Sequence, residues 1–441
     1  MTDRRTLAAE YAAGDRPADV LATTLAALDD DDPVWISRVP PDDVIARARA
    51  LDGRSPSELP LYGIPFAVKD NIDVAGIATT AACPAFSYVP ERSATVVERL
   101  EAAGAIVIGK TNLDQFATGL VGTRSPYGVP RNPFDERYIP GGSSSGSAVA
   151  VARGLVTFAL GTDTAGSGRV PAGFNGIVGL KPTFGIISAA GVVPACRSLD
   201  CVSIFARSVD DAEAVLDVAA APDPRDTFSR PRAGLAEAIP DLFRFAVPLP
   251  EQLTFCGDAD AQRSFEQACA RLAAFGGTQV AVDLAPCFAA AELLYNGAFV
   301  AERTAAFGDF AAAHPAELLD VTRTIVESGR RFSAADAFRA QYRIRELRVQ
   351  AAAIFAQAPV LVVPTTPTIY TLEEIAAEPL ARNATLGTYT NFVNLLDLCA
   401  IAIPSGHYPN GVPIGITLIA PAFADAALAA LARRVAELAL R

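Results

Sequence analysis

Short apolar runs alternate with helix-forming stretches in the first half of the chain, and this alternation constrains the fold more than any other feature. The runs at 61–68, 105–108 and 155–160 have the length of buried strands. The stretches at 94–103 and 145–153 have helical character. Strands that alternate with helices build sheets covered by helices on both faces, so we predict an α/β fold.

The 441 residues favour one interleaved domain over two separable ones. Hydrophobic residues make up 51% and charged residues 20%, so the chain can bury a large core. We predict an N-terminal helical segment at about 1–60, a core at about 61–210, a helical region at about 258–358, and closing strands with a final helix at about 359–441.

Charge and cysteine content restrict the partners and the compartment. The net charge of −12 argues against nucleic acid or an anionic membrane as the main partner. The seven cysteines are scattered and none forms a CxxC pair, which indicates buried thiols rather than a disulfide frame or a zinc site. The sequence shows neither a signal peptide nor a run of ~20 apolar residues. We therefore expect a cytoplasmic protein that uses no metal and no cofactor.

Residues 104–111 match the pattern of a phosphate-binding loop, GxxxxGK[ST]. Such a loop needs exposed backbone amides that surround an anion. The four residues between the two glycines are Ala, Ile, Val and Ile, which favour a buried strand instead. We therefore expect no nucleotide at this segment.

Two serine-bearing, glycine-rich segments flank the predicted strand at 155–160. The first is Gly-Gly-Ser-Ser-Ser-Gly-Ser at 141–147, and the second is Asp-Thr-Ala-Gly-Ser-Gly-Arg at 163–169. Small residues let consecutive backbone amides converge on one point, as an oxyanion hole requires. A flexible linker and a simple Gly/Ser turn are the alternative interpretations of these segments.

A serine hydroxyl becomes a good nucleophile only when a neighbouring base takes its proton. The chain has only two histidines, His314 and His407, and neither lies in a comparable segment. Lys69 follows an apolar run and can act as the base if burial lowers its pKa by several units from about 10.4. The alternative is a lysine paired with a carboxylate at a strand end.

Together these segments resemble the amidase signature family. The match rests on Val-Lys-Asp at 68–70, on the 141–147 segment, and on Asp-Thr-Ala-Gly-Ser-Gly-Arg-Val-Pro-Ala at 163–172. The resemblance covers about 60–210 strongly and 360–420 more loosely. It implies the amidase-signature fold, in which a central mixed β-sheet is covered by helices on both faces.

The resemblance also implies a role for each residue of a Ser-Ser-Lys triad. Ser167 is the nucleophile, Ser143 is a proton shuttle held by a cis peptide bond, and Lys69 is the final base. The oxyanion hole consists of backbone amides at Thr164, Ala165, Gly166 and Ser167. Ala165 stands where the family commonly has glycine, which is acceptable if its φ is negative.

Within the family, the sequence looks like the allophanate hydrolases. Residues 112–125, 162–171, 194–201 and 386–396 carry this similarity. It implies hydrolysis of the terminal amide of allophanate (urea-1-carboxylate) with release of ammonia, and possible homodimers. Members usually carry a second, C-terminal domain, which would here be separate or missing. The alternatives are another carboxylated amide, such as a carboxybiuret-like compound or a dicarboxylic acid monoamide, and an amidotransferase subunit.

An anionic substrate needs a cationic anchor in this acidic chain. Tyr295 and Arg303 lie eight residues apart in a stretch, 293–307, that we predict to be one helix, which brings them within about 80° of one face. Arginine can bind a carboxylate through two parallel hydrogen bonds. The resemblance assigns both residues to substrate binding, together with the backbone of Gly119. The alternative for Arg303 is an exposed helical arginine beside Glu302.

Overall fold

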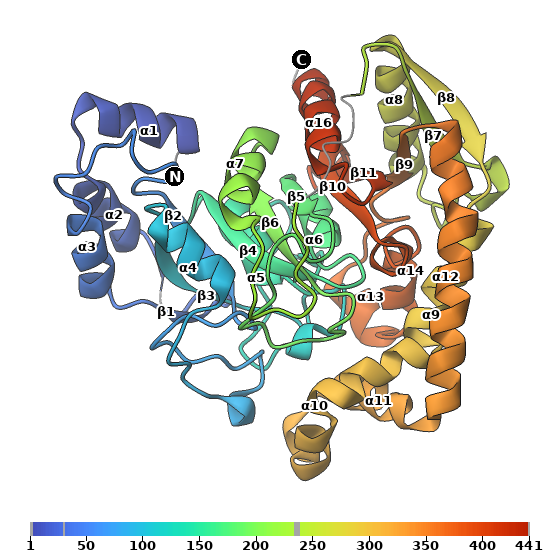
Figure 1. Ribbon diagram of the computed structural model, residues 1–441, viewed down its shortest axis with the longest axis horizontal. Helices are drawn as coiled ribbons and strands as arrows, with labels where there is room; N and C mark the ends of the chain where they lie inside the picture. The colour runs from blue at the N-terminus through green and yellow to red at the C-terminus, as the bar shows by residue number, and fades with distance from the viewer. Residues whose placement is uncertain (1–2, 30, 233–238, 440–441) are drawn as a thin grey trace.

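Eleven strands form one mixed sheet in the computed structural model, which describes residues 3–29, 31–232 and 239–439 (Figure 1). Their order across the sheet is β1-β3-β2-β4-β6-β5-β10-β11-β9-β7-β8. The strands are β1 (Trp35–Arg38), β2 (Pro65–Lys69), β3 (Ile106–Thr111), β4 (Phe158–Asp163), β5 (Val178–Lys181), β6 (Cys201–Ala206), β7 (Phe243–Pro248), β8 (Gly277–Val282), β9 (Val360–Pro364), β10 (Leu398–His407) and β11 (Pro413–Pro421).

Parallel and antiparallel pairs both occur in the sheet. Strand β2 runs parallel to β3 and β4, and β7 runs parallel to β8 and β9. Strands β4, β6, β5, β10, β11 and β9 follow one another in antiparallel pairs. The sheet is therefore mixed, as the resemblance implies.

Sixteen α-helices lie within the described residues. They are α1 (Arg4–Ala13), α2 (Pro17–Ala26), α3 (Pro41–Arg49), α4 (Thr95–Ala102), α5 (Ser145–Ala152), α6 (Arg169–Phe174), α7 (Val209–Ala219), α8 (Ala259–Ala274), α9 (Ala285–Tyr295), α10 (Ala301–Ala313), α11 (Asp320–Ser328), α12 (Ala334–Gln357), α13 (Leu372–Ala377), α14 (Ala381–Leu386), α15 (Phe392–Leu395) and α16 (Asp425–Ala439). Helices α1 to α3 lie at one end of the molecule and α12 at the other (Figure 1).

Helices cover both faces of the sheet, and strand β9 shows why. Neighbouring residues of a strand point to opposite faces. Val362 belongs to a hydrophobic core that contains Leu428 of α16. Leu361 belongs to a second core that contains Leu347 of α12. The predicted α/β fold with both faces covered is confirmed.

Several boundaries differ from the predictions. The strand predicted at 155–160 begins only at Phe158 and continues to Asp163. The reason is that Leu155 lies in the turn that closes α5, where its amide donates to the Ala150 carbonyl after Gly154 turns the chain with a φ of +69°. The strand predicted at 105–108 extends through the GKT residues to Thr111, and all of β3 is buried.

Two strands lie in segments that we predict to be helical. Strand β1 falls in the 1–60 segment and β8 in the 258–358 segment. Both lie at edges of the sheet and pair with a single neighbour, so their sequences carry only a weak apolar pattern. The sheet takes strands from all four predicted segments, and the single domain stays a prediction.

The cysteines are all free thiols. Six are buried, but Cys256 is exposed in a turn, so the prediction of seven buried thiols is wrong at this position. Within the described ranges, no helix combines the length and the apolar character needed to span a bilayer.

Candidate active site

The three residues of the predicted triad lie at or near strand ends. Lys69 is the last residue of β2, and β4 ends at Asp163, four residues before Ser167. Because β2 and β4 are parallel neighbours, their carboxyl ends meet at the same edge of the sheet. Ser143 lies two residues before α5, which packs against both strands.

Lys69 is fully buried, and its side chain contacts hydroxyl groups. Its Nζ lies 2.7 Å from Ser143 Oγ and 2.7 Å from Thr162 Oγ1. Burial lowers the pKa of Lys69 from 10.5 to about 7, although the carboxylates of Asp114, Asp200 and Asp163 act in the opposite direction. The hydrogen-bond partners of Lys69 are therefore two hydroxyls and not a carboxylate, so the alternative of an ion-paired lysine is wrong.

The neighbouring lysine, Lys110, shows the contrast. It comes from the GKT segment and forms a buried ion pair with Asp70 at 3.2 Å. Its Nζ also donates to Thr79 Oγ1 at 2.9 Å. The glycine-lysine motif thus holds the segment after β2 in place.

The Ser143 segment is held through its backbone. The Gly142–Ser143 peptide bond is cis, and the Ser143 carbonyl accepts a hydrogen bond from the Asp114 amide at 3.0 Å. The Asp114 carboxylate in turn accepts from the amides of Val121, Gly122 and Arg124. Asp114 therefore ties the Ser143 backbone to the loop that contains Gly119.

Ser167 is buried, with 2% of its surface exposed. Its hydroxyl donates to the Gly119 carbonyl oxygen at 3.4 Å. Among the described residues no hydrogen bond joins the Ser143 and Ser167 hydroxyls. The structure thus brings Ser143 to Lys69 and Ser167 to Gly119, within one cluster of buried loops.

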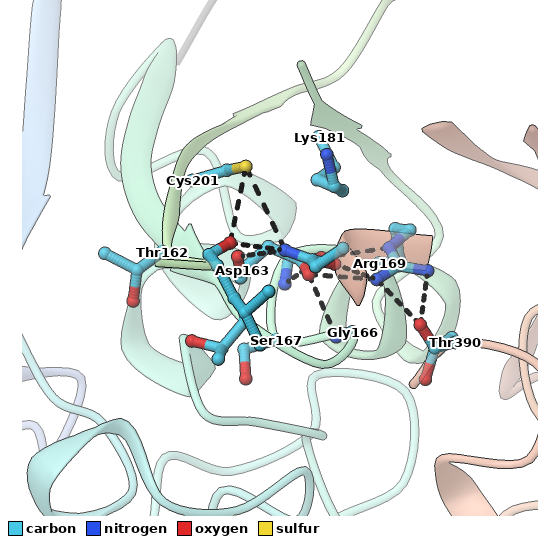
Figure 2. A network of polar contacts seen from close by, with 12 residues as sticks. Thr162, Asp163, Gly166, Ser167, Arg169, Lys181, Cys201 and Thr390 are labelled. Atoms are coloured by element: carbon cyan, nitrogen blue, oxygen red, sulfur yellow. Dashed lines mark hydrogen bonds and ion pairs between the residues drawn. The ribbon is translucent and has the colours of Figure 1, made fainter. Parts of the chain in front are cut away.

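A buried ion pair shapes the loop around Ser167. Figure 2 shows the Asp163 carboxylate between this loop and the guanidinium of Arg169. Arg169 donates to Asp163 through Nε at 3.0 Å and Nη2 at 2.9 Å, and it also donates to the Thr390 carbonyl at 3.2 Å. Burial alone would raise the pKa of Asp163, but the charge and hydrogen bonds of Arg169, together with the charge of Lys181 and the Gly168 amide, lower it.

The same carboxylate corrects one detail of the predicted oxyanion hole. The Gly166 amide donates to Asp163 Oδ1 at 2.9 Å, so this amide is already engaged. The amides of Thr164, Ala165 and Ser167 have no acceptor among the described residues. Ala165 keeps a negative φ, as its position requires.

Gly166 has a different role, which its geometry explains. Its φ is +124°, and a β-carbon at this position would lie 2.4 Å from Thr390 Oγ1. Only glycine fits this close approach without moving Thr390. The loop can therefore pass against the segment before α15.

Tyr295 and Arg303 meet, but the predicted single helix at 293–307 is wrong. Helix α9 ends at Tyr295, and α10 begins at Ala301. Gly297 interrupts them with an extended backbone, and a residue larger than glycine does not fit there because its β-carbon would lie 2.7 Å from Leu293 Cα. This break brings the two side chains together, with Arg303 Nη2 donating to Tyr295 Oη at 3.2 Å.

Arg303 is fully buried rather than an exposed helical arginine. Its guanidinium carbon lies 4.7 Å from the centre of the Tyr295 ring, and its Nη1 donates to Cys196 Sγ at 3.1 Å. Its Nε has no hydrogen-bond partner among the described residues. A buried cation with an unused donor can accept an anionic ligand. Tyr295 also lines a cavity of about 600 Å³ together with Asn383 and Asn391.

Sequence reasoning missed the residues that support the triad. Thr162 is the second partner of Lys69, Asp114 holds the Ser143 backbone, and Asp163 with Arg169 fixes the Ser167 loop. Thr162 and Asp163 are polar residues at the end of a buried strand, and this position could have marked them as site residues from the sequence. Across the described ranges, no group of three or more His, Cys, Asp or Glu side chains could hold a metal ion.

Comparison with known proteins places this geometry in context. The sequence profile of the Amidase family matches residues 19–429. Urea amidolyase of Lachancea kluyveri is 48% identical over 409 residues, which make up 92% of this chain and 22% of that protein. The chain thus spans about a fifth of the length of this relative.

Two further proteins match over larger parts of their own length. A glutamyl-tRNA(Gln) amidotransferase chain of Symbiobacterium thermophilum is 40% identical over 87% of this chain and 85% of its own length. A selenomethionine-substituted allophanate hydrolase of Kluyveromyces lactis is 45% identical. It superposes with a TM-score of 0.94 over 98% of this chain and 72% of that chain.

Proposed function

Since the chain belongs to the amidase family, we propose that it hydrolyses the terminal amide of allophanate and releases ammonia. The observation that carries the proposal is the 2.7 Å hydrogen bond between Lys69 Nζ and the Ser143 hydroxyl. Burial lowers the pKa of Lys69 to about 7, so a large fraction of this lysine is neutral near neutral pH. A neutral lysine at hydrogen-bond distance can act as a general base.

The proposed reaction begins with a proton relay. Neutral Lys69 takes the proton of the Ser143 hydroxyl, and Ser143 takes the proton of Ser167. The Ser167 hydroxyl first turns from the Gly119 carbonyl towards Ser143. Its oxygen then forms a bond to the amide carbon, and the C=O electron pair moves to the oxygen.

The oxyanion that forms needs hydrogen-bond donors in a site without water. The amides of Thr164, Ala165 and Ser167 supply these donors in our proposal. The Gly166 amide stays with Asp163 and contributes by fixing the loop. Arg169 contributes in the same indirect way through its ion pair with Asp163.

The intermediate then collapses and the C–N bond breaks. Protonated Lys69 returns its proton through Ser143 to the leaving nitrogen, which departs as ammonia. Water repeats the same steps on the acyl-enzyme and regenerates Ser167. The product is a dicarboxylate, which then loses carbon dioxide.

Substrate recognition depends on the carboxylate at the far end of allophanate. We assign this group to Arg303, whose Nε is unused and whose guanidinium is held by Tyr295. The Gly119 backbone would lie beside the reacting amide, because its carbonyl already contacts Ser167. A short anionic amide therefore fits the two ends of the site better than a neutral one.

Ammonia release from a panel of amides tests the proposal. The panel contains allophanate, malonamate, biuret and propionamide, with Ser167→Ala as the blank for each. We expect fast, Ser167-dependent release from allophanate and slow release from propionamide. Release from malonamate or biuret but not from allophanate would move the function to another small amide. Glutaminase activity that needs a second protein would indicate an amidotransferase subunit.

Partners beyond the substrate also belong to the proposal. We expect a homodimer, and we expect a separate protein or domain to act on the dicarboxylate product. Light scattering of the purified chain tests the first expectation. Carbon dioxide release by the chain alone, compared with the spontaneous rate of the product, tests the second.

A further inference from the structure

Asp200 is a buried carboxylate that the proposed reaction does not use. It precedes the first residue of β6, and the register of β4 and β6 pairs Asp163 with Cys201. Asp200 therefore lies across from Thr164, the first residue of the Ser167 loop. Only 6% of its surface is exposed, so its charge must be stabilised by local hydrogen bonds.

The two sides of Asp200 contact different parts of the site. The Thr164 hydroxyl donates to Oδ1 at 2.5 Å. The amides of Ala195 and Cys196 donate to Oδ2 at 2.8 and 3.1 Å. One carboxylate thus connects the Ser167 loop to the turn at 195–200.

Helix α10 holds the turn at 195–200 from its other side. Arg303 donates to Cys196 Sγ at 3.1 Å. The preceding residue, Glu302, accepts from the Ser198 amide at 2.9 Å and from the Ser198 hydroxyl. Two consecutive residues of α10 therefore hold the turn that Asp200 organises.

A continuous series of hydrogen bonds follows from these contacts. It runs from Thr164 through Asp200 and Cys196 to Arg303. In the proposed reaction, one end stabilises the oxyanion and the other binds the substrate carboxylate. The length of this series sets the separation of the two subsites.

We infer that Asp200 is a positioning residue that fixes the distance between the oxyanion loop and the Arg303 anchor, and so makes the site selective for short anionic amides. The inference rests on the proposed function, because it needs Arg303 to bind substrate. A purely local role of Asp200 in holding the turn at 195–200 would give a different result. Its loss would then lower stability, but its effect on kcat/KM would not depend on Arg303.

A double-mutant cycle of Asp200→Asn and Arg303→Ala, measured as kcat/KM for allophanate, separates these roles. Three donors now meet the two Asp200 oxygens, and asparagine replaces one of these oxygens by an NH₂ group that cannot accept, so at least one contact is lost. We expect each single variant to lose about 100-fold, the range for a lost hydrogen bond to a charged group. We expect the double variant to lose about 10³-fold, because Asp200 acts partly through Arg303.

The control is Asp211→Asn on α7, a buried carboxylate whose ion pair with Arg4 lies outside the site. We expect it to keep the wild-type kcat/KM. If Asp200→Asn does not fold, as judged by circular dichroism, Thr164→Val replaces it in the cycle and removes only the hydroxyl contact. Its expected loss is about tenfold in the wild-type background and about threefold beside Arg303→Ala.

Independent effects would overturn the inference. In that case the variant with both Asp200→Asn and Arg303→Ala would lose about 10⁴-fold in kcat/KM, or Thr164→Val would still lose about tenfold beside Arg303→Ala. Such a result would leave the proposed function intact, since wild-type hydrolysis of allophanate would persist. A wild-type protein that releases no ammonia from allophanate would instead contradict the proposed function itself.

Discussion

The site combines two regions that are built in different ways. The catalytic edge, formed by the ends of β2 and β4 with the segments of Ser143 and Ser167, consists of buried loops in which Lys69, Asp163 and Arg169 are hydrogen-bonded to their neighbours. The helical region at 285–357 carries Arg303 and consists of α9 to α12, interrupted at Gly297. In this region α12 exposes much of its surface, as its place at the edge of the molecule suggests (Figure 1).

This difference indicates that the two regions have separate roles in the proposed reaction. Strand ends hold the reacting groups, because a buried sheet leaves little freedom to the residues that follow it. The helical region reaches the same site through a few contacts, such as the hydrogen bond from Arg303 to Cys196. We infer that the catalytic edge sets the chemistry and that the helical region sets the substrate.

Removing the buried charge at the catalytic edge should have the largest effect on stability. Arg169→Met leaves the Asp163 carboxylate buried without its partner, which we expect to cost about 3–5 kcal/mol in the free energy of unfolding. Urea denaturation measures this cost. A loss below about 1 kcal/mol would mean that the loop does not depend on the ion pair.

Changing the anchor should alter specificity more than chemistry. Arg303→Ala should lower kcat/KM for allophanate about 100-fold, since a hydrogen-bonded charge partner of the substrate is lost. The same variant should change kcat/KM for propionamide less than about threefold. Equal losses on both substrates would show that the helical region also supports the chemical steps.

The pH dependence of activity tests the protonation state of Lys69 at the catalytic edge. In the proposed reaction the active form needs neutral Lys69, and burial lowers the pKa of Lys69 from 10.5 to about 7. Activity should therefore rise with pH up to about 7 and level off above it, falling about tenfold for each pH unit below. Initial rates between pH 5.5 and 9, corrected for spontaneous loss of substrate, give this profile. A rise that continues to pH 10 would mean that Lys69 keeps its ordinary pKa.

An exposed ion pair in the helical region should have the smallest effect. Arg343 and Glu346 on α12 lie 3.0 Å apart with both side chains largely in solvent. Glu346→Gln should change the free energy of unfolding by less than about 0.5 kcal/mol. It is the matched control for Arg169→Met, because both changes remove one partner of an ion pair. If Glu346→Gln and Arg169→Met lowered the free energy of unfolding by similar amounts, the two regions would not differ in how much their ion pairs stabilise the fold.

The sequence allowed much of the catalytic edge to be predicted, because local pattern determines it. The strands at β2, β3 and β4, the helix α5 and the segments of Lys69, Ser143 and Ser167 all follow from runs of neighbouring residues. The roles of these residues stay predictions, and the geometry is compatible with them except at the Gly166 amide.

The rest could not be predicted because it depends on contacts between distant segments. Asp163 accepts from the Gly166 amide while Arg169, which also donates to the Thr390 carbonyl, holds the Asp163 carboxylate. The break at Gly297 is a local exception, because this glycine packs on the backbone of Leu293 in α9 within a stretch whose residues look continuously helical. Edge strands β1 and β8 take their form from a single neighbour in the sheet.

Covalent labelling followed by intact-mass measurement tests the central claim most directly. The wild-type protein, quenched during turnover of allophanate or treated with a small sulfonyl fluoride, should gain one adduct, and peptide mapping should place it on Ser167. Ser167→Ala should gain none, and Lys69→Ala should react far more slowly. An adduct on another residue, or equal labelling of Ser167→Ala, would contradict the account.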